Sequence, residues 1–148
     1  MLPSLRSSDA MATLTVPATI DQLPVVFDYL RGQTPQEYSI ILDHVLLAVE
    51  ELLVNVFTHA YADTQGLTTV DCRIVAQNGN EYLCVTVKDW GPHFDPFTQA
   101  PEPDLSLEIE DRPIGGLGVH LIKSVATHVR YQRLDDANVV DLYFTKKT

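Results

Sequence analysis

The spacing of apolar residues along the chain predicts helices and strands in a definite order. Alternating apolar residues predict an opening strand over residues 11–16. Apolar residues at steps of three and four predict three helices, over residues 20–30, from Pro35 or Glu37 to about Tyr61, and over 117–127. Runs rich in β-branched residues predict four more strands, over 67–76, 82–89, 129–134 and 139–145, with turns at 77–80 and 135–138.

This order of elements predicts an α+β fold. We expect a two-layer α/β sandwich with a mixed, mostly antiparallel sheet and three helices on one of its faces. Residues 1–11 are predicted to be a flexible leader, and residues 12–148 a single domain. The proline-rich stretch over about 92–115 is too long for an ordinary connection, which predicts a lid or binding loop.

The charge of the chain narrows the classes of partner. Lys and Arg number 10 and Asp and Glu number 20, so the net charge is −10. This balance disfavours both nucleic acid and anionic membranes as partners, because both attract basic surfaces. Two cysteines make no disulfide framework, no run is long enough to span a membrane, and the first residues do not resemble a secretory signal. We therefore expect a cytoplasmic protein.

The long predicted helix carries polar residues close to its apolar stripe. Glu51, Asn55 and His59 follow one another at steps of four, so their side chains share one helix face. A carboxylate and a carboxamide suit a hydrated Mg²⁺, where the amide oxygen is a ligand and the carboxylate accepts a proton. Taken alone, the same residues also fit a solvated polar face.

Two glycine-containing segments add further candidate chemistry. Asp89 ends a predicted buried strand and Gly91 follows it, so the carboxylate can accept a hydrogen bond from an exocyclic amine and the glycine lets backbone approach a ring. Later, Gly115, Gly116 and Gly118 stand where a loop enters a helix, and the bare N–H groups of such a helix start attract anions. Each segment alone also fits an ordinary turn or hinge.

Together, the three segments resemble the GHKL (Bergerat-fold) ATPases. The resemblance rests on Glu-x-x-x-Asn-x-x-x-His-Ala-Tyr on a helix, Asp-x-Gly-x-x-Phe-Asp-Pro after a strand, and Gly-Gly-x-Gly opening a helix. Within these ATPases the chain is similar to the single-domain serine-protein kinases and anti-sigma factors of the RsbW/SpoIIAB type, over roughly residues 13–146. One departure is that Asn138-Val139-Val140 occupies the place of a late threonine that many members have near the adenine.

The resemblance implies a role for each matching residue. It implies that Glu51 is the general base, that Asn55 holds Mg²⁺ and so helps to bind ATP, and that Asp89 binds the adenine amine above Gly91. The loop at the helix start would wrap the phosphates, and Arg112 would contact phosphate or hold the lid shut. The loop residues are Gly115, Gly116, Leu117 and Gly118.

The implied activity is ATP-dependent transfer of phosphate to a serine or threonine. The implied substrate is an anti-anti-sigma protein with a STAS domain, a sigma factor is the other implied partner, and a homodimer is possible. The main alternative is a non-catalytic module whose nucleotide switches its affinity for a sigma factor or another regulator. The catalytic half of a histidine kinase and a scaffold that binds no nucleotide fit the chain less well.

Overall fold

The structure is a computed structural model that describes residues 12–60, 66–99 and 116–147. Its strands are β1 (Leu14–Pro17), β2 (Leu67–Gln77), β3 (Asn80–Asp89), β4 (His128–Leu134) and β5 (Ala137–Phe144). Its helices are α2 (Leu23–Gln33), α3 (Leu42–Asn55), α4 (Pro96–Gln99) and α5 (Gly116–Val125). Shorter helical segments are η1 (Ile20–Gln22), η2 (Gln36–Ile41) and η3 (Val56–Ala60).

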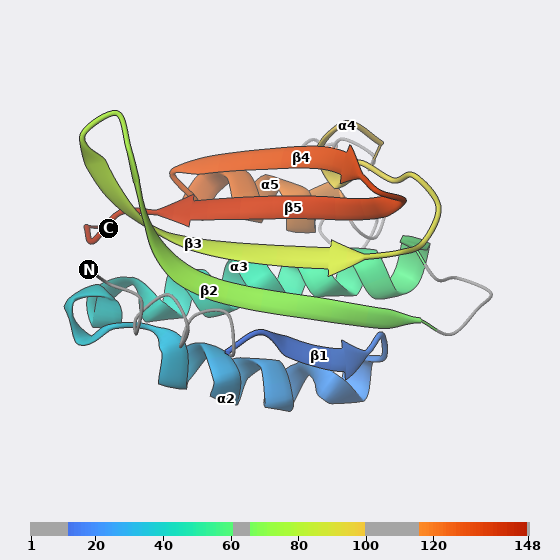
Figure 1. The fold of residues 1–148 in the computed structure, drawn as a ribbon, viewed down its shortest axis with the longest axis horizontal. Helices are drawn as coiled ribbons and strands as arrows, with labels where there is room; N and C mark the ends of the chain where they lie inside the picture. The colour runs from blue at the N-terminus through green and yellow to red at the C-terminus, as the bar shows by residue number, and fades with distance from the viewer. Residues whose placement is uncertain (1–11, 61–65, 100–115, 148) are drawn as a thin grey trace.

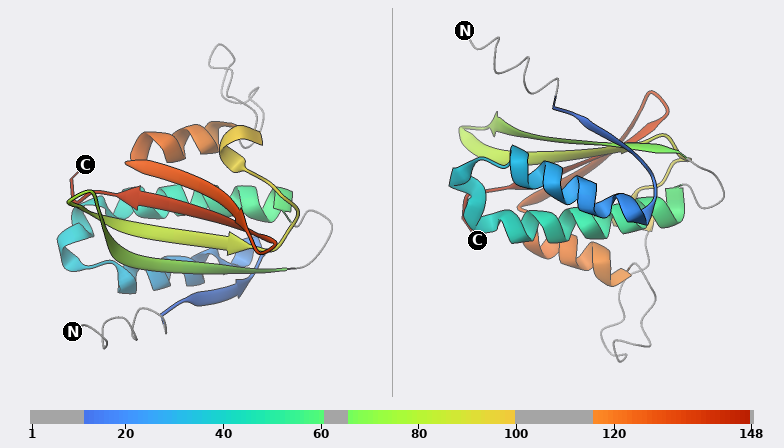
Figure 2. Two further views of the ribbon diagram at one scale, coloured as in Figure 1. Left: turned by 45° about the horizontal axis from the view of Figure 1, so that its top comes forward. Right: turned by 90° about the horizontal axis from the view of Figure 1, so that it is seen from below.

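The strands form one sheet in the order β1-β2-β3-β5-β4. Each pairing between neighbouring strands in the described residues is antiparallel. Helices α2, α3 and α5 cover one face of this sheet, as Figure 1 and Figure 2 show from three directions. The predicted α+β sandwich with helices on one face is therefore confirmed.

Tight turns set the register of the two hairpins. Asn78 and Gly79 have φ of 53° and 80°, the left-handed conformations of a two-residue hairpin turn between Gln77 and Asn80. Asp135 and Asp136 form the second such turn, with φ of 50° and 65°. Both turns were predicted too long. Residue 77 already belongs to β2 and residue 80 to β3, and residues 137 and 138 belong to β5.

The predicted helices differ from the observed ones mainly at their ends. The segment expected as one helix from residue 35 to about 61 comprises η2, which is a 3₁₀-helix, then α3, then η3, which is a π-helix. Helix α2 continues to Gln33, three residues beyond the predicted end at residue 30. The stretch predicted as a lid contains the short helix α4, and its residues 100–115 lie outside the described residues, as does the predicted leader over 1–11.

The hydrophobic core lies between the sheet and the helices. Val45, Ala48 and Leu52 of α3 are fully buried, as the predicted apolar stripe requires. The helix-facing residues of the central strands, such as Val85 and Leu142, are fully buried against them. Burial of this apolar surface is the main force that holds the helical layer on the sheet.

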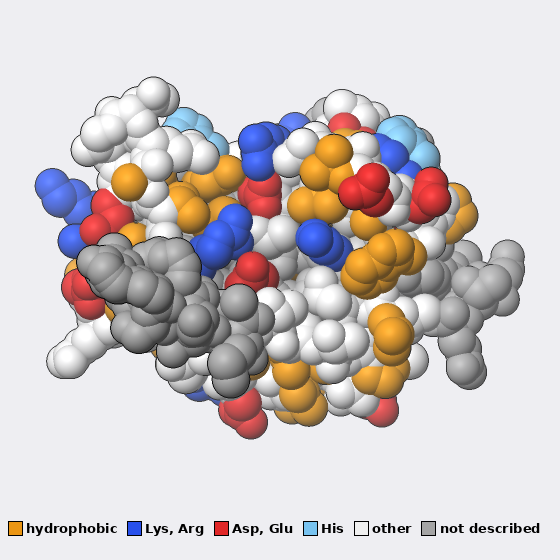
Figure 3. Space-filling model, viewed as in Figure 1, with side chains coloured by type: hydrophobic (Ala, Val, Ile, Leu, Met, Phe, Trp, Pro, Cys, Tyr) orange, Lys and Arg blue, Asp and Glu red, His pale blue; other side chains and the backbone are white. Residues whose placement is uncertain are grey.

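The other face of the sheet carries a row of charged and hydroxyl side chains (Figure 3). The Thr86 hydroxyl donates to Asp141 Oδ1 at 2.6 Å, and Arg130 donates to Asp141 Oδ2 at 2.8 Å. Arg73 in turn donates to Thr86 Oγ1 at 3.0 Å. The buried Asp141 carboxylate is thus paired and hydrogen-bonded, as a buried charge must be.

In the part of the chain that the structure describes, no helix has the length and apolar character needed to cross a membrane.

Candidate functional site

A row of polar side chains crosses the end of the sheet on its helix-covered face. Thr68 of β2 pairs with Asp89 of β3, Asp89 pairs with Asn138 of β5, and Asn138 pairs with Arg133 of β4. Residues paired in this way project on the same side of a sheet. Thr68, Asp89 and Asn138 are all buried, whereas the residues two positions along each of their strands are apolar. We call this row the polar rung.

The Asp89 carboxylate lies at the centre of the polar rung. Its Oδ1 accepts hydrogen bonds from the Gly91 backbone N–H at 3.0 Å and from the Asn138 side-chain amide at 2.8 Å. Burial raises the pKa of Asp89, while the two donors and the positive charge of Arg133 lower it in part. The two donors hold the carboxylate in one orientation.

Asn138 also fixes the loop that follows β3. Its amide nitrogen donates to Pro92 O at 2.9 Å, and its oxygen accepts from the Phe94 N–H at 3.1 Å and from the Tyr131 hydroxyl at 2.6 Å. Arg133 donates to Gly91 O at 2.7 Å. The segment from Gly91 to Phe94 is therefore bound at three backbone positions to strands β4 and β5.

The end of the long helix meets the same loop. The ring of His59, in the π-helical segment η3, stacks at a tilt on Phe94 with 5.2 Å between the ring centroids. Phe94 is itself hydrogen-bonded to Asn138. The end of the helix that carries Asn55 thus contacts the loop after Asp89 through the rings of His59 and Phe94. π-helical turns occur frequently at functional sites.

Glu51 lies where α3 contacts the first turn of α5. A Cβ placed on Gly118 would be 2.6 Å from Glu51 Oε2, so the carboxylate can keep this position only while residue 118 lacks a side chain. The N-terminus of a helix carries partial positive charge that stabilises an anion. Burial is the main cause that raises the pKa of Glu51, and the negative charge of Glu50 adds to it.

Asn55 ends α3 and is buried, with 2% of its surface exposed. Its amide nitrogen donates to the backbone carbonyl of Glu51 at 3.2 Å, which uses the amino side of the amide within the helix. The amide oxygen is therefore the atom directed away from that bond. An oxygen held in this way is the donor type that Mg²⁺ selects.

The structure brings the predicted site residues to one end of the molecule. The C-terminal ends of α3 and β3 and the N-terminal end of α5 lie together at the right of Figure 1. Gly116 and Leu117 open α5. The predicted residues Arg112 and Gly115 lie outside the described residues.

Three members of the site were missed by the sequence analysis. Asn138 was noted only as a replacement for a threonine, and Arg133 and Thr68 received no role. Asn138 was hidden because it was assigned to a turn. For Thr68 a signal was present, since the Asn78-Gly79 turn sets the register that places Thr68 opposite Asp89.

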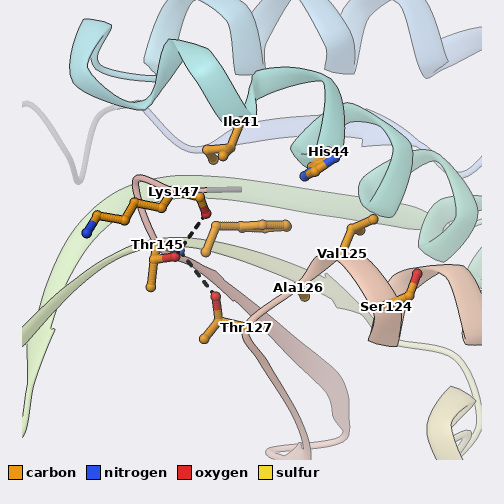
Figure 4. A pocket seen from close by; sticks show the side chains of 9 residues that line it. Ile41, His44, Ser124, Val125, Ala126, Thr127, Thr145 and Lys147 are labelled. Carbon is orange, nitrogen blue, oxygen red and sulfur yellow. Dashed lines mark hydrogen bonds between the residues drawn. The ribbon is translucent and has the colours of Figure 1, made fainter.

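A cavity of about 320 Å³ lies elsewhere, at the opposite end of β5 (Figure 4). It is lined by the start of α3, the end of α5 and the chain after β5, including His44, Thr127 and Lys147. Phe144 at this cavity is six residues from Asn138, about 20 Å along an extended strand. None of the predicted site residues lines it, so we do not assign the candidate site to this cavity.

The role of Asn138 gives a prediction about stability and its pH dependence. We expect Asn138→Ala to lower the free energy of unfolding by about 1–3 kcal/mol, because buried groups lose their partners. Asp89 has a raised pKa in the folded state, so its ionisation opposes folding as pH rises. Without the Asn138 donor this penalty grows, and the loss measured by urea unfolding should be larger near pH 8 than near pH 5.

The matched control is Gln132→Ala, on the neighbouring strand but on the opposite face of the sheet. It should change the free energy of unfolding by less than about 0.5 kcal/mol. An equal loss for Asn138→Ala at both pH values would show that Asn138 does not support the ionised form of Asp89.

Comparisons with known proteins found one family and similar solved structures. Residues 16–144 match the model of a family described as the histidine kinase-like ATPase domain. The histidine kinase domain of a blue-light activated histidine kinase from Erythrobacter litoralis EL346 is similar at 21% sequence identity, with a TM-score of 0.46, over 90% of this chain and 67% of that chain. None of the curated proteins matches. From the family match, the chain belongs to the histidine kinase-like ATPase domain family.

Proposed function

We propose that this protein binds ATP and transfers its γ-phosphate to a serine or threonine of a STAS-domain partner, as RsbW/SpoIIAB-type anti-sigma factors do. The observation that carries this proposal is the Glu51 carboxylate held against Gly118 in the first turn of α5. A module that only binds nucleotide does not need a carboxylate at the phosphate end of its site. A kinase needs one there to accept the proton of the attacking hydroxyl.

The adenine end of the proposed ATP site is the polar rung. Asp89 would accept a hydrogen bond from the exocyclic amine through Oδ2, because Oδ1 is held by Gly91 and Asn138. The bound loop from Gly91 to Phe94 would form the edge of the base pocket. The substitution of the late threonine by Asn138 keeps a hydrogen-bond donor on Asp89, which supports adenine binding despite the change.

The phosphate end of the proposed site is the start of α5. The N–H groups that point out of the first turn and the dipole of this ten-residue helix both favour phosphate oxygens. Gly116 and Gly118 allow close approach of the backbone. Arg112 and Gly115, outside the described residues, are carried into the proposal by the resemblance alone.

Asn55 would hold Mg²⁺ by its amide oxygen, and the bound cation would neutralise phosphate charge. The fit rests on the amide nitrogen being bonded within the helix, which directs the oxygen away. Phosphate oxygens and water can complete the coordination shell, so no cluster of carboxylates is required. In the described residues no group of three His, Cys, Asp or Glu side chains is arranged to hold a metal.

In the proposed step, Glu51 accepts the proton of the serine or threonine hydroxyl. The hydroxyl oxygen forms a bond to the γ-phosphorus, the bond from that phosphorus to the β,γ-bridging oxygen breaks, and ADP leaves. The raised pKa of Glu51 makes its carboxylate a stronger base than an exposed glutamate. The added charge of about −1.5 to −2 on the partner would then weaken the complex by repulsion.

One prediction of this proposal separates catalysis from the binding of ATP. Glu51→Gln should bind Mg-ATP within about two-fold of the wild type, because the amide keeps the side chain's shape, and should lose transfer by about 10²–10⁴-fold. Asn55→Ala should lose the Mg²⁺ dependence of binding. Calorimetric titration of ATP with and without Mg²⁺ measures binding, and labelled ATP with a STAS-domain protein measures transfer.

The neighbouring variant Glu50→Gln is the control, and it should keep both activities near neutral pH. Full transfer by Glu51→Gln would contradict the catalytic role of Glu51. Binding of ATP without transfer in the wild type would favour the alternative, a module that sequesters a sigma factor or another regulator.

A second prediction concerns the pH dependence of transfer. Glu51 must be ionised to accept a proton, so the rate should fall as pH falls through its raised pKa. The charge of Glu50 contributes to that raised pKa, so Glu50→Gln should lower it and move the acid side of the pH–rate profile to lower pH. A profile unchanged by Glu50→Gln would argue against Glu51 as the titrating base.

A third prediction uses the contact between Gly118 and Glu51. Gly118→Ala should push the carboxylate away and lower the transfer rate by more than it lowers ATP affinity. Stability should hold or rise by up to about 1 kcal/mol, because alanine favours helix. Gly32→Ala in α2 is the matched control, since its added Cβ meets nothing within 4 Å, and it should leave transfer unchanged.

A further inference from the structure

We propose that the hydroxyl of Thr68 is a second recognition group for the nucleobase, one that accepts a hydrogen bond from the exocyclic amine alongside Asp89. This inference rests on the proposed ATP site and adds a specificity-determining residue to it. It concerns the side of the polar rung opposite Asn138, on strand β2.

The Thr68 hydroxyl is buried and has no partner. Thr68 is fully buried, and its Oγ1 is the one buried side-chain polar atom, among the residues that the structure describes, that lacks a hydrogen-bond partner. Buried hydroxyls are almost always hydrogen-bonded, since an unpaired one costs free energy. By contrast, the buried hydroxyl of Thr86, on the other face of the sheet, has a partner, because it donates to Asp141.

The backbone places Thr68 beside the Asp89 carboxylate. The two residues are partners in the β2–β3 ladder, and Thr68 lies on the same face as Val70 and Cys72 of the core. The side of the sheet that faces the helices is apolar along β2 until this position. Thr68 therefore adds a hydroxyl to the helix-facing side of β2, where the neighbouring residues on that side are Val70 and Cys72.

The spacing of the two strands suits an amino group. Neighbouring strands lie about 4.8 Å apart. The two hydrogens of a planar amine point about 120° apart, so acceptors at about 2.9 Å from its nitrogen are about 5 Å from each other. An exocyclic amine between the strands can therefore donate one hydrogen to Asp89 and the other to Thr68. A carbonyl in the same place would face the Asp89 carboxylate and be repelled.

The test is a cycle that changes the protein and the ligand in turn. Calorimetry measures the affinities of ATP and of purine riboside 5′-triphosphate, which has hydrogen in place of the amine, for the wild type and for Thr68→Val. Valine has the shape of threonine without the hydroxyl. We expect ATP to bind about three- to ten-fold more weakly to Thr68→Val, and the purine analogue to bind both proteins equally.

Thermal unfolding of the same variant shows whether the fold is intact. We expect the midpoint for Thr68→Val to equal or exceed that of the wild type, because the lost hydroxyl has no partner to leave behind. Thr69→Val is the matched control: it lies on the same strand but projects from the opposite face, and it should leave both affinities unchanged.

The outcomes are distinguishable. ATP affinity that is unchanged in Thr68→Val would overturn this inference and leave the proposed ATP site intact. Equal weakening of ATP and the purine analogue would also overturn it, because the hydroxyl would then not act on the amine. Absence of ATP binding by the folded wild type would instead contradict the proposed function itself.

Discussion

The burial of the Asp89 carboxylate at the end of the sheet is the constraint on which the site depends. A buried charge is costly unless hydrogen bonds replace the lost water. Here the replacements are the Gly91 N–H and the Asn138 amide, with Arg133 nearby. Gly91 lies in the loop after β3, Asn138 on β5 and Arg133 on β4, so these groups come together only when the sheet is complete. Burial makes ionisation of Asp89 less favourable in the folded protein than in the unfolded chain, and the donors that offset part of this cost come together only in the finished fold.

The local parts of this arrangement were predictable from the sequence. Apolar steps of three and four predicted the helix that carries Glu51 and Asn55, and a β-rich run predicted the strand that ends in Asp89. Both predictions depend on periodicity within one segment, which a sequence displays directly. The π-helical end of that helix was missed, because residues 56–60 continue the same spacing of apolar and polar positions.

Contacts between segments far apart in the sequence were harder to predict, and each missed contact has a specific cause. The two-residue Asn78-Gly79 turn was recognisable, yet its register was not carried through to Thr68 and Asp89. The second turn uses Asp135 and Asp136 at positive φ, a weaker signal than Asn-Gly, and reading it as four residues removed Asn138 from the sheet. The bond from Arg133 to Gly91 further requires β5 to lie between β3 and β4, which no local pattern encodes.

The fold separates the proposed base-recognition groups from the proposed catalytic carboxylate. The polar rung is built by the sheet and its turns, whereas Glu51 and Gly118 meet at the contact between α3 and α5. The two regions are linked through the helix end at Asn55 and the rings of His59 and Phe94. In the proposed ATP site, substitutions in the polar rung, such as asparagine in place of a late threonine, thus change the affinity for the base while the environment of Glu51 stays the same. This separation explains how the chain can depart from the usual GHKL pattern at Asn138 and still retain the Glu51 carboxylate at the proposed phosphate end.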